Sequence, residues 1–305
     1  MPALRIATRG SALALVQTRL AAQALRDIHP GLTIEEVVIT TEGDRDRTTP
    51  LTVLGGRGVF VRSVEEALLD GRADVAMHSL KDVPTEPLPG LTLAAVLPRA
   101  DVRDALVTRA GVRLADLPAG ARVGTSSRRR VALLRAARPD VVTTELRGNV
   151  DTRLRRVTEG TVEGAVLAAA GLARLNRLDG KAELLDPLTF VPAPGQGAIV
   201  LQCRADDTAT LALLRAIDDR DTHLATDAER GALAALGSGC SLPVGAHAVI
   251  EGGRLRLRGF IEDDAGAAYF EDTEGSAAEA AALGLDVGRR LAARAGVSDV
   301  AGASS

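Results

Sequence analysis

The alternation of strands and helices along the chain constrains its fold more than any other feature of the sequence. Short apolar segments rich in β-branched residues alternate with amphipathic helical segments over residues 4–217. Glycine, proline or small polar residues stand at the junctions, where they end one element and begin the next. This order predicts an α/β architecture, and for residues 105–168 a mostly parallel sheet with helices on both faces.

A length of 305 residues is too great for one compact core, so we expect several domains. A hinge at residues 98–103 is predicted to separate two α/β blocks, and a strand at 198–203 to return to the first block. Beyond residue 219, strands follow one another between helices, which indicates a small α+β domain. The predicted domains are residues 1–98 with 198–217, residues 103–192 and residues 219–305, with a cleft between the first two.

Composition excludes several classes of protein. No apolar run approaches the roughly 20 residues of a membrane span, and the amino terminus has no signal-peptide pattern. The two cysteines exclude a disulfide framework and favour the cytoplasm. Aromatic residues make up 2% of the chain and the net charge is -3, so nothing points to nucleic acid. We expect a cytoplasmic monomer that binds neither nucleic acid nor membranes, and no metal site is predicted.

Basic residues are concentrated in one segment. Residues 122–156 hold ten arginines and three acidic residues, a field that attracts small polyanions. Two strand–turn–helix junctions lie there, Gly124–Arg130 and Leu146–Arg153, and the start of each predicted helix carries arginine. Backbone N–H groups and the helix dipole favour anions at such termini, and guanidinium groups bind carboxylates in bidentate fashion. Each arginine alone is more simply a solvated charge, but two basic termini at neighbouring strand ends favour one anion site.

A buried strand at residues 74–77 leads directly into the segment His78–Pro84. Ligands of open α/β sheets bind beyond the carboxyl ends of strands, and this segment lies there. A helix cap or a surface ion pair is the simpler interpretation of Lys81 and Asp82. Two features favour a site instead: nearly every other basic residue is arginine, and Val83–Pro84 holds the backbone extended beside the Asp82 carboxylate.

One of the two cysteines, Cys240, lies in the Gly/Ser/Pro-rich segment Leu236–Gly245. Such a segment predicts a loop, where a thiol is accessible to reagents. The alternative is a small hydrophobic residue buried under a turn. Cys203 stands in an apolar strand, and we interpret it as part of the core.

With these features placed, the chain resembles the porphobilinogen deaminases over nearly its whole length, from about Leu4 to Ala295. Any one of the shared motifs is weak evidence, whereas their occurrence together and in order is highly specific. The motifs are Arg5–Arg9, Gly55–Phe60, His78–Pro84, Gly124–Ser127, Leu146–Asn149, Pro194–Gly197 and Gly239–Cys240.

The resemblance implies two domains like periplasmic binding proteins, a third that carries the cysteine, and a dipyrromethane cofactor joined to Cys240 by a thioether. This cofactor primes the head-to-tail condensation of four porphobilinogen molecules with loss of ammonia. Hydrolysis then releases the linear tetrapyrrole hydroxymethylbilane, a step of haem biosynthesis. By similarity Asp82 is the catalytic carboxylate. The other implied cofactor-binding residues are Lys81, Ser127, Arg129, Arg130, Arg147, Asp44 and Thr125. The implied substrate-binding residues are Arg9, Ser11, Arg153, Arg174 and Gln17.

The chain departs from the family pattern at four positions. Val53, Arg57 and Arg62 replace lysines that some members have, and Ser238 replaces a glycine that commonly precedes Gly-Cys. We therefore transfer no role to Arg57 or Arg62. The competing class is a non-enzymatic two-lobed binding protein for a small polyanion, but such proteins are usually exported and need neither a third domain nor a tethering thiol.

Overall fold

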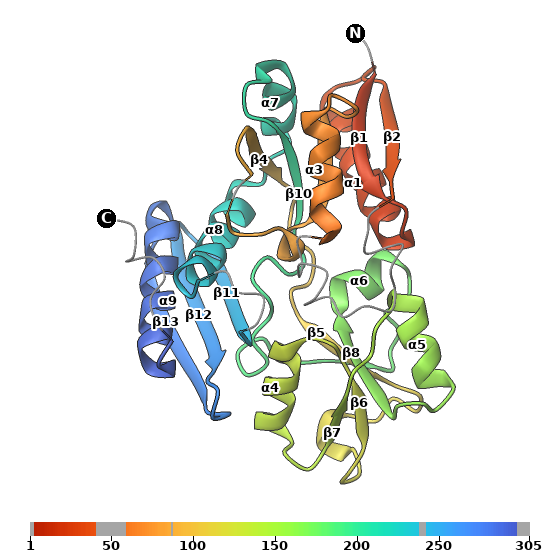
Figure 1. Ribbon diagram of the computed structural model, residues 1–305, viewed down its shortest axis with the longest axis vertical. Helices are drawn as coiled ribbons and strands as arrows, with labels where there is room; N and C mark the ends of the chain where they lie inside the picture. Colours follow the sequence, from red (N-terminus) through yellow and green to blue (C-terminus); the bar gives the residue numbers. More distant parts are fainter. Residues whose placement is uncertain (1–2, 41–58, 87, 238–241, 298–305) are drawn as a thin grey trace. The chain divides into compact units, whose positions relative to one another are not determined.

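The computed structural model describes residues 3–40, 59–86, 88–237 and 242–297 (Figure 1). Two compact units share the chain: Met1–Arg99 with Ala198–Thr226, and Ala100–Gly197 with Asp227–Ser305. The chain thus passes three times between the units, at residues 99–100, 197–198 and 226–227. The finer division into three domains stays a prediction.

The first unit is built on a five-stranded sheet with the order β2-β1-β3-β10-β4. In that order the strands span Ile34–Ile39, Leu4–Arg9, Val75–Ser79, Ile199–Arg204 and Leu91–Val96. Strand β1 is parallel to β2 and β3, whereas β10 is antiparallel to both β3 and β4. The helices of this unit are α1 (Ala12–Ile28), α3 (Val59–Leu69), α7 (Thr208–Arg215) and the first residues of α8 (Arg220–Ala235).

Helices α1 and α3 cover opposite faces of this sheet, because successive side chains of β3 point to opposite faces. Val75 and Met77 pack in one buried cluster with Leu25 of α1. Ala76 packs in another with Val64 of α3. Both helices alternate apolar and polar positions because one side of each packs on the sheet. The carboxyl end of β3 therefore lies between two layers of helix.

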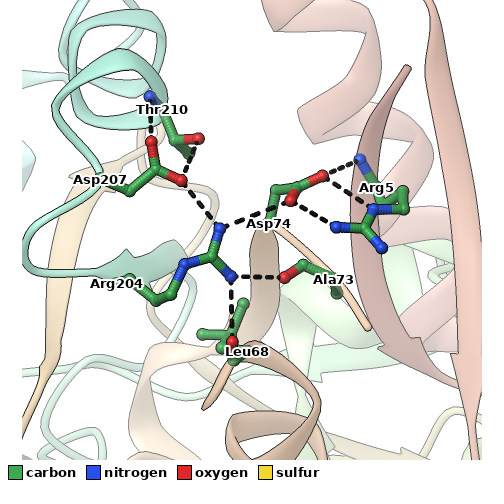
Figure 2. A network of polar contacts seen from close by, with 7 residues as sticks. All are labelled: Arg5, Leu68, Ala73, Asp74, Arg204, Asp207 and Thr210. Atoms are coloured by element: carbon green, nitrogen blue, oxygen red, sulfur yellow. Dashed lines mark hydrogen bonds and ion pairs between the residues drawn. The ribbon is translucent and has the colours of Figure 1, made fainter. Parts of the chain in front are cut away.

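A network of ion pairs closes the amino-terminal end of β1 and β3 (Figure 2). The guanidinium of Arg204 donates to the carbonyls of Leu68 and Ala73, each at 2.9 Å, and to Asp207 at 2.8 Å. Asp74 pairs with Arg5 at 2.8 Å. Burial opposes the charge of Asp74, but the hydrogen bonds from Arg5 outweigh burial and hold its pKa below the usual value. The network therefore secures the sheet at the end opposite to the Asp82 segment.

Arg204→Met is expected to lower the free energy of unfolding by about 2–3 kcal/mol, because it leaves the carbonyls of Leu68 and Ala73 without this donor and removes the ion pair with Asp207. Urea unfolding measures this loss. The kcat should not change, since the network lies at the far end of the strands from Asp82. Arg254→Met removes a more exposed arginine, paired with Glu274 at 2.7 Å, and should leave both quantities unaltered. Equal stability of the two variants would contradict the structural role given to Arg204.

The second unit contains another five-stranded sheet, with the order β7-β6-β8-β5-β9. In that order the strands span Val142–Thr144, Arg122–Gly124, Gly164–Ala168, Asp104–Thr108 and Ala182–Leu184. Strand β6 is parallel to β7 and β8, but β5 is antiparallel to β8 and β9. Four of the five strands therefore run in the same direction, as expected for a mostly parallel sheet, and β5 alone is reversed. Its direction was not predictable, because alternation with helices does not fix the direction of a strand that enters from another part of the chain. The helices here are α4 (Arg128–Ala137), α5 (Val150–Thr158) and α6 (Ala169–Arg174).

The carboxyl-terminal part of the second unit is an antiparallel meander of β11 (Val244–Glu251), β12 (Arg254–Glu262) and β13 (Ala268–Ser276). Helix α9 (Ala280–Ala295) packs on β12 and β13 and also lies against α8. A Cβ at Gly288 of α9 would collide with the carbonyl of Ala232 in α8, so the two helices approach backbone to backbone. The predicted α/β class with a small carboxyl-terminal α+β part is confirmed. Over the residues that the structure describes, no helix is both long and apolar enough to span a membrane.

Candidate functional site

The Lys81–Asp82 pair lies on a short 3-10 turn, Leu80–Asp82, that directly follows β3. The amide of Leu80 donates to the carbonyl of Ala198 at 3.1 Å, and the amide of Val83 donates to the carbonyl of Leu80 at 3.1 Å. Leu80 is buried and packs with Val83 and Ala198. Lys81 and Asp82 are only partly buried. An apolar anchor thus fixes the backbone while the two charged side chains reach its surface.

Gln17, a predicted substrate-binding residue, supports the end of β3 from within the unit. Its side chain is almost fully buried in α1 and exchanges two hydrogen bonds with the hydroxyl of Ser79, at 2.9 and 3.2 Å. Ser11 caps α1 by accepting a hydrogen bond from the amide of Ala14 at 3.2 Å, as its sequence position predicts. Arg9 is half-buried at the end of β1. These three residues therefore lie in the same unit as Asp82, and Gln17 lies behind the strand end.

The two predicted basic helix termini do follow neighbouring parallel strands. Ser127 caps α4 by accepting from the amide of Arg130 at 3.4 Å, and the hydroxyl of Thr125 accepts from the amide of Ser127 at 3.2 Å. Asn149 caps α5 in the same manner at 2.9 Å. A Cβ at Gly124 would lie 2.6 Å from the side chain of Leu146 in the second junction. The glycine therefore allows the two junctions to pack against each other.

Arg129 and Arg130 do not extend into solvent. Their side chains are 3% and 7% exposed, and both pair with the fully buried carboxylate of Asp104, at 2.8 and 2.7 Å. They also donate to the carbonyls of Val191 and Val166, at 2.6 and 2.9 Å. Burial opposes the charge of Asp104, but the two guanidinium groups outweigh burial and hold the pKa of this carboxyl far below its usual value. This cluster fixes the first turn of α4 to β5 and adds positive charge beneath it.

Three other predicted arginines are more accessible and belong to the same unit. Arg147 is half-buried at the start of the second junction. Arg153 donates to the carbonyl of Gly148 at 2.9 Å. Arg174 of α6 donates to the carbonyl of Gly197 at 2.8 Å, and burial lowers its pKa to about 10, which still leaves it protonated at neutral pH.

A cavity of about 450 Å³ adjoins the amino terminus of α4. Thr125, Ser126 and Arg128 line it, together with Leu242 and Pro243. Leu242 is the first described residue after the cysteine-bearing segment. The lining also includes Arg135 of α4, residues 143–145, and acidic side chains of the β12–β13 turn. In the described parts of the chain no group of three or more His, Cys, Asp or Glu side chains is arranged to hold a metal ion.

Several of the residues considered from the sequence lie outside the described ranges: Cys240, Asp44, Val53, Arg57 and Ser238. Cys203, by contrast, is described and fully buried, and burial raises its pKa to about 11. Its assignment to the core is confirmed. Asp104 was not recognised from the sequence. The one feature that could have indicated a buried ion pair was an acidic residue at the start of an apolar strand.

Comparison with known proteins gives the same picture along the whole chain. The family model "Porphobilinogen deaminase, dipyromethane cofactor binding domain" matches residues 4–212, and "Porphobilinogen deaminase, C-terminal domain" matches residues 223–293. The porphobilinogen deaminase of Roseiflexus sp. strain RS-1 is 49% identical over 300 residues, covering 98% of this chain and 99% of that protein. That of Sorangium cellulosum strain So ce56 is 46% identical over 293 residues, covering 94% and 98%.

Among solved structures, a periplasmic VFT2 domain of Bordetella pertussis BvgS matches with a TM-score of 0.43 and 18% identity, over 70% of this chain and 86% of that one. An arginine-specific periplasmic binding protein of Salmonella typhimurium matches with a TM-score of 0.41 and 13% identity, over 73% and 94%.

Two mixed α/β sheets, basic helix termini and full-length family matches define a cofactor-dependent enzyme of tetrapyrrole biosynthesis. The interpretation as a non-enzymatic binding protein is therefore set aside. The chain belongs to the porphobilinogen deaminase family, also called hydroxymethylbilane synthase, and contains that family's dipyrromethane cofactor-binding domain.

Proposed function

We propose that Asp82 is the catalytic carboxylate of this porphobilinogen deaminase. The observation that carries the proposal is the anchored Leu80–Asp82 turn, which fixes the backbone of a partly accessible carboxylate at the carboxyl end of β3. Departure of ammonia from the aminomethyl group of porphobilinogen leaves a cationic pyrrole, which a preorganised carboxylate stabilises. The same group is placed to donate a proton to the leaving amine and to accept one from the pyrrole carbon that has reacted.

The described residues suit a cofactor that carries several carboxylates. The first turn of α4 presents backbone N–H groups next to the hydroxyls of Thr125 and Ser127, and α5 presents a second terminus beside Arg147. When bound, dipyrromethane supplies the pyrrole carbon to which the first substrate unit is joined. We propose that Cys240 holds it by a thioether. The other residues proposed to bind it, by contact or through the charge of the α4 terminus, are Lys81, Asp44, Thr125, Ser127, Arg129, Arg130 and Arg147.

Arg129 and Arg130 have a particular place in this proposal. Because both side chains are paired with Asp104, we propose that they assist cofactor binding through the positive charge and rigidity of the α4 terminus. Arg147 and Arg153 have the more accessible guanidinium groups. Arg9, Ser11, Arg153, Arg174 and Gln17 remain the proposed substrate-binding residues. Of these, the buried Gln17 acts through Ser79 in its described position.

We also propose that the enzyme works as a monomer in the cytoplasm. Two cysteines, one of them a buried free thiol, suit a reducing compartment. Gel filtration with light scattering tests the oligomeric state. The activity itself is tested by incubating the purified chain with porphobilinogen and following hydroxymethylbilane as the porphyrin that forms from it after cyclisation and oxidation. Binding of porphobilinogen without release of tetrapyrrole would contradict the proposal.

Arg147→Leu is expected to remain folded but to lose at least about tenfold in kcat/KM, or never to load the cofactor, because a charge-assisted hydrogen bond to a carboxylate is lost. Circular dichroism and the porphobilinogen assay measure the two effects. Arg122→Leu is the matched control: it removes an arginine of the same basic segment at the opposite end of β6, where it pairs with Glu163 at 2.9 Å. Unimpaired product formation would indicate a solvated surface charge instead, and unfolding of Arg147→Leu would indicate a structural role; either result would contradict the proposed role in binding.

A further inference from the structure

Three polar side chains are buried together on the α3 face of the first sheet. Glu65 of α3, Gln202 of β10 and His78 of β3 are 8%, 2% and 5% exposed. The amide nitrogen of Gln202 donates to Glu65 Oε1 at 2.9 Å, and its oxygen lies 3.0 Å from His78 Nε2. Buried polar groups are costly unless they are paired, so a row of three in an otherwise apolar layer calls for an explanation.

The order of these contacts fixes the protonation pattern of the ring. The amide nitrogen of Gln202 only donates and therefore faces the carboxylate of Glu65, which leaves the amide oxygen to face His78. An oxygen accepts, so His78 Nε2 carries the hydrogen and donates it. In the neutral ring, Nδ1 then has a lone pair and no hydrogen.

The ring stands immediately before the segment that carries Asp82. Burial lowers the pKa of His78 to about 4, against smaller opposing effects of Gln202 and of the negative charge of Asp82. His78 is therefore neutral at neutral pH and does not act as a competing cation for the Asp82 carboxylate. The charged groups that this ring faces are Asp82 on the following turn and, through Gln202, Glu65 on α3.

His78 and Ser79 are consecutive residues that are held from opposite layers. Gln202 and Glu65 hold His78 on the α3 face, whereas Gln17 of α1 holds Ser79 on the other. Directional hydrogen bonds on both faces fix the rotation of the strand end more sharply than apolar packing alone, and the next residue begins the Leu80–Asp82 turn. An amide does not pass a proton along in the manner of a water or an imidazole, so the row orients the ring and does not conduct protons to it.

From this geometry we propose that His78 is a positioning residue for Asp82, held by Gln202 and Glu65 as the neutral Nε2–H tautomer at the base of the Leu80–Asp82 turn. The proposal rests on the catalytic role proposed for Asp82. It assigns His78 no contact with substrate: the ring acts by fixing where the carboxylate stands and by adding no charge next to it.

The test is nitrogen NMR of the holoenzyme labelled with ¹⁵N-histidine. The signals of the His78 ring are identified as those that are missing from the spectrum of His78→Gln. The wild type is expected to show a neutral Nε2–H ring at neutral pH. Gln202→Met keeps the side-chain volume and removes both hydrogen bonds. It is expected to populate the Nδ1–H tautomer and to lower kcat by about tenfold to a hundredfold with little change in KM, because a small displacement of a catalytic group has effects of that size.

Cys203→Ala is the matched control. Cys203 directly follows Gln202 on β10, but its side chain is buried in the cluster on the opposite face of the sheet, against α1. It is expected to lose stability but to keep the His78 tautomer and the kcat of the wild type. A protonated or Nδ1–H ring in the wild type, an unchanged kcat in Gln202→Met, or an equal loss of kcat in Cys203→Ala would overturn the proposal. Wild-type turnover in Asp82→Ala would also overturn the proposal, because Asp82 would then have no catalytic role for His78 to support. The NMR measurement reports the tautomer directly, so it distinguishes this outcome from a wrong tautomer assignment.

Discussion

Asp82→Ala is expected to lower kcat by about a thousandfold, because the preorganised carboxylate that stabilises each cationic intermediate is removed while the anchored turn remains. Four condensations use the same group, so a defect in each step appears in overall turnover. Asp82→Glu should retain part of the activity, since the charge survives and only its position changes. Steady-state assays with porphobilinogen compare the three proteins, and circular dichroism checks that they are folded.

A matched control exists in the second unit. Asp116 also ends a 3-10 turn, Leu114–Asp116, and its side chain is exposed. Asp116→Ala should therefore leave kcat at the wild-type value. If Asp82→Ala remained within a few-fold of the wild type, the carboxylate would have a structural role only, and the catalytic assignment would be wrong.

Local features of the site were predictable from the sequence because they depend on neighbouring residues. Ser11 and Ser127 each stand immediately before a helix, a position where serine is typical of a cap, and both accept the hydrogen bond that a cap requires. The two basic helix termini were expected on neighbouring strands, and β6 and β7 are paired in parallel. A short polar residue before an amphipathic run is sufficient to predict such an end.

Features that depend on distant parts of the chain were not predictable. Asp104 meets Arg130 across 26 residues, and nothing local distinguishes a guanidinium that enters a buried ion pair from one that faces a ligand. His78 meets Gln202 across 124 residues, and Gln202 meets Glu65 across 137. The antiparallel directions of β5 and β10 escaped prediction for the same reason, since both strands follow passages of the chain between the two units.

The two cysteines offer the most direct test of the cofactor assignment, because they stand in different sequence contexts. A thioether requires a nucleophilic thiolate at an accessible place. Cys203 is fully buried in β10, and burial raises its pKa to about 11, so its thiol stays protonated at neutral pH. Cys240 stands in a glycine- and serine-rich segment of the sequence. Leu242 and Pro243, which follow that segment in the sequence, line the cavity with Thr125 and Ser126.

Active protein is therefore expected to carry an adduct of two linked pyrrole units, and only on Cys240. Cys240→Ala should lose that mass and essentially all activity, since no primer remains to which porphobilinogen can be joined. Cys203→Ala should keep both, at some cost in stability from the cavity it leaves in the core. Intact-mass measurement and peptide mapping of the three proteins give the answer. Active protein with only its polypeptide mass, or an adduct on Cys203, would show that synthesis does not start from a primer held at Cys240.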